Sequence, residues 1–133
     1  MFWSLLLDFG LVVLIWMTQL VVYPSFTHFS ETDLIGWHIK YTTAITYLVM
    51  PLMVAQLSIH SWALIQNFSW MEVVIMVLIG LAWVNTFLFA VPLHRRIDKK
   101  EEVMEAAEAL VKVNWYRTAI WTIVFLLGLV SLS

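Results

Sequence analysis

One uncharged stretch decides the fold class: Val73–Leu93, VVIMVLIGLAWVNTFLFAVPL. A helix of about 20 apolar residues crosses the roughly 30 Å hydrocarbon layer of a membrane. Three further stretches have the same character. The four predicted spans are residues 3–23, 41–65, 73–93 and 113–132, and the last reaches full length only if residues 113–117 lie at the interface. Backbone polar groups in lipid must bond within their own segment, so we expect all four spans to be helices.

Composition argues against a water-soluble domain. The 133 residues are 62% hydrophobic and 12% charged, with a mean hydropathy of +0.89, which leaves too little polar surface to cover a soluble globule. Short connections predict antiparallel neighbours, and hence a single all-α domain, residues 1–133, built as an up-down-up-down four-helix bundle. The first span carries Asp8, has no basic start and lacks a small-residue cleavage site, so we expect a retained helix rather than a secretion signal.

The basic residues indicate the orientation. All seven fall beside the first or third connection: Lys40, Arg95, Arg96, Lys99, Lys100, Lys112 and Arg117. Cytoplasmic loops hold the excess of lysine and arginine, so we expect both termini outside the cytoplasm. The net charge is −2 and no basic cluster is interleaved with aromatic residues, so we expect no nucleic-acid partner. The expected partner is the lipid bilayer, and a homo-oligomer or a larger membrane complex stays open.

Prolines and charged runs predict the helix ends. Tyr23-Pro24-Ser25 is expected to end the first helix, since proline disfavours a helical conformation in the preceding residue. Residues 30–33, SETD, offer caps for the second helix, and Pro51 and Pro92 should kink the second and third. Residues 97–112 are rich in helix formers with one apolar band. They predict a cytoplasmic amphipathic helix or an extension of a span, with a charged face that is solvated or docks a partner.

Ionisable residues at membrane depth usually face the bundle interior. The second span carries an inward stripe with steps of three or four residues: His38, Thr42, Thr46, Val49, Met53, Gln56 and His60. In the first span Asp8 and Gln19 share a face. The topology places Asp8, His60 and Glu72 toward the outer side, where Asp8 is the natural partner of His60. This buried pair is either structural or part of a proton relay.

A second polar cluster is expected near the cytoplasmic mouth. It combines Tyr23, His38, Tyr41, Thr42, His94, Asn114 and Arg117. Arg117 is the strongest candidate, because a guanidinium inside the interface needs an anion, carbonyl groups or room to reach water. His38 and His94 could ligate haem or a metal, although neither has a carboxylate or second histidine one turn away to complete a site. The chain has no cysteine, which excludes thiolate metal sites and disulfides.

Three motifs carry a family resemblance. They are Tyr23-Pro24-Ser25-Phe26, Val91-Pro92-Leu93-His94 and Asn114-Trp115-Tyr116-Arg117-Thr118. In their order and spacing the chain resembles small bacterial four-helix integral membrane proteins grouped with the anthrone oxygenase-like domain. The resemblance implies a four-helix fold in the bacterial inner membrane. It also implies a shared site of Tyr23, Pro24, His94, Asn114 and Arg117. The few such proteins linked to anthrone oxidation act on polyketide-like aromatic molecules without a metal.

These observations leave several functions open. The leading hypothesis is a pocket between the helices, open toward the cytoplasm, that binds or oxidises a small apolar or aromatic molecule. Tyr23, Tyr41, Thr42, Asn114 and Arg117 would contact the ligand. If the protein is an enzyme, His94 or His38 would be the base and Arg117 would stabilise a developing oxyanion. The alternatives are a non-catalytic accessory subunit of a larger membrane complex and an electron carrier associated with haem or quinone.

Overall fold

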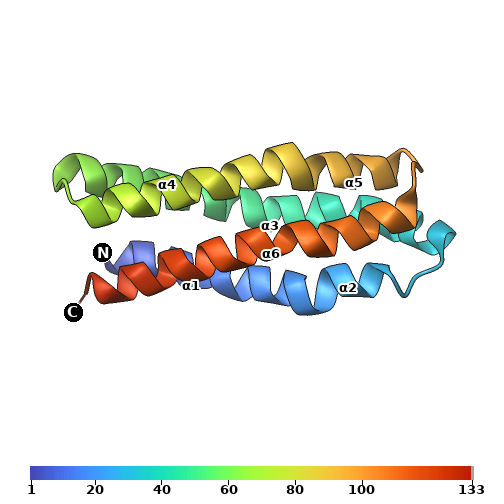
Figure 1. Ribbon diagram of the computed structural model, residues 1–133, viewed down its shortest axis with the longest axis horizontal. Coiled ribbons are helices and arrows are strands. Elements are labelled where there is room, and N and C mark those ends of the chain that lie inside the picture. Colours follow the sequence, from blue (N-terminus) through green and yellow to red (C-terminus); the bar gives the residue numbers. More distant parts are fainter. Residues whose placement is uncertain (133) are drawn as a thin grey trace.

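The computed structural model describes residues 1–132 and is all-helical. It contains four continuous helices that are long and apolar enough to cross a membrane: Phe2–Phe26, Glu31–Gln66, Trp70–Asp98 and Val103–Val130. They lie side by side along one axis, and the N- and C-termini are at the same end of the bundle (Figure 1). The predicted all-helical fold with four helices of membrane-spanning length is confirmed.

The first and third long helices each contain one wide turn. The first is α1 (Phe2–Met17), the π-helix η1 (Thr18–Val22) and α2 (Tyr23–Phe26). The third is α4 (Trp70–Asn85), the π-helix η2 (Thr86–Ala90) and α5 (Val91–Asp98). In both, the first N–H after the π-turn bonds to the carbonyl of the threonine that opens it, and a proline follows directly.

These wide turns correct the expectation that the first helix ends at Tyr23-Pro24-Ser25, because the helix continues through Pro24 to Phe26. A π-turn closes its hydrogen bonds over one residue more than an α-turn. Pro24 and Pro92 then lie in the first turn of the α-helical segment that follows, where proline is tolerated. Each proline is therefore accommodated within a continuous helix.

The second long helix, α3 (Glu31–Gln66), starts where its capping residues predict. The Ser30 side chain accepts a hydrogen bond from the Asp33 backbone N–H at 3.2 Å. Glu31 and Asp33 also place negative charge in the first turn, where the helix dipole favours it. Pro51 lies inside this helix, as the sequence places it.

The fourth long helix, α6 (Val103–Val130), runs without interruption from the charged region to the C-terminal end. Residues 97–112 therefore do not form a separate helix. Ile97 and Asp98 close α5, a tight turn follows, and the remainder is the first part of α6. Lys100 and Glu102 adopt left-handed backbone conformations in this turn, and the Arg96 side chain pairs with that of Glu102. Of the two readings of this segment, the extension of a span describes it.

The bundle exposes many large apolar side chains and buries polar ones beside its apolar core. Large apolar side chains such as Tyr47 and Ile65 are more than three quarters exposed. The buried polar side chains are Asp8, Thr18, Gln19, His38, Gln56, His60, Asn85, Thr86, Asn114, Arg117 and Thr118. A soluble protein hides its apolar groups, whereas lipid favours them on the surface. The interior polar groups gather in two regions, one toward each end of the bundle.

Candidate functional site

A cavity of about 280 Å³ lies in the bundle and is lined by residues of all four long helices. Its apolar wall includes Leu14, Ile15, Ile45, Val49, Met50 and Trp121. Its polar wall includes Tyr23, Tyr41, Thr42, Thr86, His94, Asp98 and Arg117. Ligand sites are typically apolar clefts with a few fixed polar groups, and this cavity has that composition.

Arg117 of α6 reaches the cavity wall, although its side chain is only 6% exposed. One terminal nitrogen donates to Asn114 Oδ1 at 2.7 Å and to the Tyr23 hydroxyl at 3.2 Å. The other donates to the Thr86 hydroxyl at 3.4 Å, and the buried Nε has no partner. Within residues 1–132 no carboxylate lies within ion-pair distance of Arg117. The guanidinium is thus a buried cation held only by neutral acceptors.

A network behind Arg117 fixes its orientation. Asn114 Nδ2 donates to Gln19 Oε1 at 3.0 Å, which turns the Asn114 oxygen toward the guanidinium. The Thr118 hydroxyl donates to the same Gln19 oxygen at 3.0 Å, and Gln19 Nε2 donates to the Val111 carbonyl at 3.1 Å. Asn114 is fully buried and does not line the cavity. The structure therefore places this predicted ligand contact behind Arg117.

His94 of α5 and His38 of α3 face each other beside the cavity. His38 Nε2 and His94 Nδ1 are 2.7 Å apart. His94 Nε2 is 3.0 Å from the Tyr23 hydroxyl, and His38 Nδ1 is 2.7 Å from Asp98 Oδ1. Only His94 of the pair lines the cavity, while His38 is completely buried. The two imidazoles thus join Asp98 to Tyr23, and Tyr23 in turn bonds to Arg117.

The distance between these imidazoles bears on the metal hypothesis. Two nitrogens bound to one tetrahedral zinc ion lie roughly 3.3 Å apart, given zinc–nitrogen bonds near 2.05 Å. The facing nitrogens of His38 and His94 are closer, at a hydrogen-bond distance. In the described part of the chain, no three His, Asp or Glu side chains are placed to hold a metal ion. In this arrangement the two imidazoles share a hydrogen bond, and their facing nitrogens are too close to bind one zinc ion together.

Tyr41 and Thr42 also line the cavity, as expected for ligand contacts. The Thr42 hydroxyl donates to the carbonyl of His38 in its own helix at 3.0 Å, so its oxygen still has accepting capacity. The structure adds residues that the sequence interpretation did not assign to the site, namely Asp98, Thr86 and Trp121. Asp98 follows His94 by one helical turn in α5, so the expectation that neither histidine has a carboxylate one turn away is wrong. The buried indole N–H of Trp121 has no partner.

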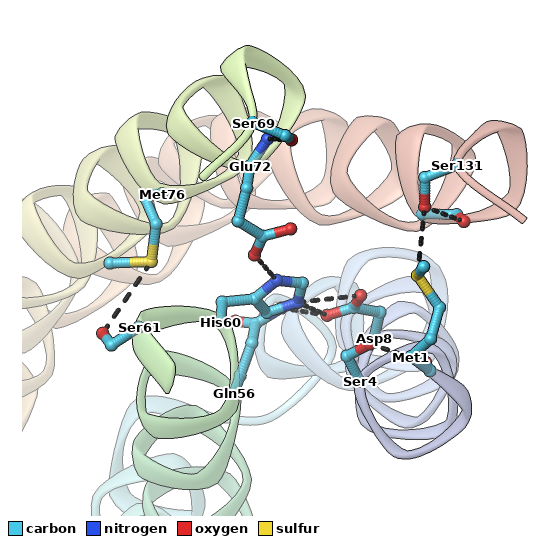
Figure 2. A network of polar contacts seen from close by, with 11 residues as sticks. Met1, Ser4, Asp8, Gln56, His60, Ser61, Ser69, Glu72, Met76 and Ser131 are labelled. Atoms are coloured by element: carbon cyan, nitrogen blue, oxygen red, sulfur yellow. Dashed lines mark hydrogen bonds and ion pairs between the residues drawn. The ribbon is translucent and has the colours of Figure 1, made fainter. Parts of the chain in front are cut away.

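A second polar cluster lies near the ends of the chain (Figure 2). His60 of α3 sits between two carboxylates, with Nε2 3.2 Å from Asp8 Oδ2 and Nδ1 2.5 Å from Glu72 Oε1. Gln56 Nε2 donates to Asp8 Oδ1 at 2.7 Å. The predicted pair of Asp8 and His60 is therefore in contact, and Glu72 of α4 completes it. The cluster ties α1, α3 and α4 together but does not line the cavity.

No protein-family model, curated protein or solved structure matches this chain. Fold alone does not assign an activity, so the chemistry of the cavity carries the functional conclusion.

Proposed function

We propose that this chain is a membrane protein whose helical bundle binds a small, largely apolar or aromatic molecule that carries an anionic group. Arg117 would contact that group. The observation that carries the proposal is the buried guanidinium at the cavity wall, which has an unpartnered Nε and no carboxylate beside it.

The energetics of a buried cation support this reading. A charged side chain inside a membrane is costly, and the cost is offset when the charge pairs or faces a polar cavity. Arginine stays protonated in proteins, so Arg117 cannot avoid the cost by losing its proton. The acceptors around it are a hydroxyl on Tyr23, another on Thr86 and an amide on Asn114, all neutral. A ligand anion would supply the missing charge, and its hydrogen bonds to a guanidinium would be strong.

The cavity wall supports the apolar part of the ligand. Toward the middle of the bundle the wall is aliphatic or aromatic, with Leu14, Ile15 and Trp121. Thr46 and Phe87 line the cavity and are also exposed on the side of the bundle, where lipid would lie. Arg95 and Asp98 form its opposite, charged end. A molecule dissolved in the bilayer could enter from the side with its polar group near water.

The charge pattern supports an orientation for this arrangement. Basic residues gather at the end of the bundle where α5 joins α6, and the chain termini lie at the other end (Figure 1). By the positive-inside rule, the polar end of the cavity faces the cytoplasm of a bacterial cell and both termini lie outside it.

The test is the set of small molecules that copurify with the protein. Wild type and Arg117→Gln would be purified in mild detergent, and released compounds identified by mass spectrometry. Glutamine keeps hydrogen-bonding capacity and removes the charge. Lys112→Gln is the matched control, because Lys112 is a cation on the same helix but is exposed. We expect anionic apolar or aromatic compounds with wild type and Lys112→Gln, at least about tenfold depleted with Arg117→Gln.

Equal recovery of such compounds from folded Arg117→Gln would contradict the proposal. The same preparation tests the alternatives. Stoichiometric copurification of another membrane protein with no small molecule would favour an accessory subunit, and a haem absorption band would favour an electron carrier.

A further inference from the structure

Four hydrogen bonds join Arg117 at the cavity wall to Asp98 at its charged end. The line runs through Tyr23, His94 and His38, with separations of 3.2, 3.0, 2.7 and 2.7 Å. Three of its members, Tyr23, His38 and Arg117, are buried. The Asp98 side chain is 40% exposed. The line therefore begins inside the cavity and ends where a proton can pass to water.

The two ends fix the direction of every hydrogen bond. A carboxylate only accepts and a guanidinium only donates. With neutral imidazoles, His38 Nδ1–H donates to Asp98 and His38 Nε2 accepts from His94 Nδ1–H. His94 Nε2 then accepts from the Tyr23 hydroxyl, whose oxygen accepts from Arg117. Each of the three middle groups holds one proton that it can pass on and one site that can receive another.

We propose that this line is a proton relay and that the ligand is a lipophilic weak acid, bound as its anion. The inference rests on the proposed function and specifies the ligand class and the fate of its proton. The neutral acid enters from the bilayer, and its O–H bond breaks beside Tyr23. Tyr23 receives that proton while its own passes to His94 Nε2, the His94 Nδ1 proton to His38 Nε2, and the His38 Nδ1 proton to Asp98.

The charges balance at each end of this sequence. The ligand anion is left beside the Arg117 guanidinium, and the proton on Asp98 leaves for water. When the ligand departs as the neutral acid, a proton from water returns along the same line and restores the first arrangement. No oxidant or other reactant is consumed.

Aromatic rings pack against the two imidazoles of the relay. The Phe26 ring packs edge-on against His38, with centroids 5.8 Å apart, and against Tyr41 at 5.2 Å. The Tyr41 ring lies 6.4 Å from both imidazoles. The ionisable groups that face the two histidines are Tyr23, Tyr41, Asp98 and, beyond Tyr23, Arg117. Of these, Asp98 is the exposed group that can exchange the proton with water.

The test uses para-nitrophenol, a lipophilic weak acid whose anion absorbs visible light and whose neutral form does not. The full chain is mixed rapidly with the probe at a pH where the free probe is neutral, so that any phenolate that forms is bound to the protein. We expect the bound phenolate to form roughly 100-fold more slowly in Asp98→Asn and His38→Gln than in wild type. Asparagine can still accept the hydrogen bond from His38, and position 98 is exposed. The substitution Asp98→Asn therefore removes the proton acceptor with little other change.

His60→Gln is the matched control, because His60 lies on the same helix and is also bonded through both nitrogens, but to the other polar cluster. We expect its rate to equal that of wild type. Unchanged rates in folded, probe-loaded Asp98→Asn and His38→Gln would overturn the relay while leaving the ligand site intact. If wild type gives no saturable phenolate signal, or if Arg117→Gln gives the same signal, the proposed function is overturned and the inference with it.

Discussion

The imidazole rings of His38 and His94 have centroids 5.0 Å apart and an interplanar angle of 28°, and they share a 2.7 Å hydrogen bond. One belongs to α3 and the other to α5, so the contact joins two long helices beside the cavity. Both outer nitrogens are occupied as well, by Asp98 and Tyr23. The pair is therefore both a structural link between helices and the centre of the line of hydrogen bonds.

Replacing His94 with leucine should destabilise the bundle. The change leaves His38 Nε2, inside the bundle, without its partner. An unsatisfied buried polar group costs about 1–3 kcal/mol, so we expect the free energy of unfolding in mixed micelles to fall by that amount. His28→Leu, at an exposed histidine, is the control and should change it by less than about 0.5 kcal/mol. Equal free energies of unfolding for the two variants would show that the imidazole pair does not stabilise the bundle.

His60→Leu should cost more than His94→Leu. The change leaves Asp8, which is 1% exposed, facing Glu72 without the imidazole between them. Removing one partner of a buried ion pair typically costs about 3–5 kcal/mol. The same denaturation experiment measures it, and the double variant Asp8→Asn, His60→Leu should recover part of the loss. No recovery in the double variant would mean that the carboxylate of Asp8 is not the source of the cost.

Gly128 should tolerate larger side chains poorly. A Cβ built there lies 3.3 Å from Leu5 Cδ1 and 3.7 Å from Asp8 Oδ2, in the contact between α1 and α6. We expect Gly128→Val to lower the free energy of unfolding by about 1–3 kcal/mol through overpacking. Gly80→Val is the matched control, since nothing lies within 4 Å of a Cβ there. A larger loss at Gly80 than at Gly128 would contradict the packing of α1 against α6.

The orientation can be tested directly because the chain has no cysteine. Asn67→Cys and Lys99→Cys place single thiols at exposed positions at the two ends of the bundle. With both termini outside, a membrane-impermeant thiol reagent should label Asn67→Cys in intact cells and Lys99→Cys only after the cells are opened. The reverse pattern would place the charged end of the cavity outside the cell.

Much of the fold follows from the sequence because the driving forces are simple. An uncharged stretch such as residues 73–93 is long enough to span a membrane, and its backbone must then be helical. The capping residues correctly predicted that the second helix begins at Glu31, with Ser30 as its N-cap. The contact between Asp8 and His60 followed from helical periodicity combined with span order, since both side chains face inward at the same end.

The local backbone of the first and third helices could not be predicted in this way. Each π-turn adds a residue to one turn and rotates everything after it, so helical periodicity no longer gives the correct faces beyond Thr18 or Thr86. The first helix also continues through Pro24 and ends at Phe26, one residue beyond the predicted Tyr23-Pro24-Ser25, since the preceding π-turn accommodates the proline.

The partners within the site were also only partly predictable. The order of the predicted spans places His38, His94, Tyr23 and Arg117 at one end of the bundle, but it does not give side-chain distances between helices. The hydrogen bond between His38 and Asp98 depends on where α5 ends, and the sequence leaves open whether the segment with Asp98 is a separate amphipathic helix or the extension of a span. Asn114 was expected to contact the ligand, and packing places it behind Arg117.

The central claim is that Arg117 provides a positive charge for an anionic ligand in an apolar cavity. The most direct measurement compares the affinities of para-butylbenzoate and its neutral analogue para-butylbenzamide for wild type and Arg117→Gln by titration calorimetry. A hydrogen bond to a charged group contributes about 1.5–3 kcal/mol, and each 1.4 kcal/mol is tenfold in affinity. We expect wild type to bind the carboxylate at least about tenfold more tightly than the amide, and Arg117→Gln to lose that preference. Equal affinities of wild type for the two compounds, or a preference that persists in Arg117→Gln, would contradict the claim.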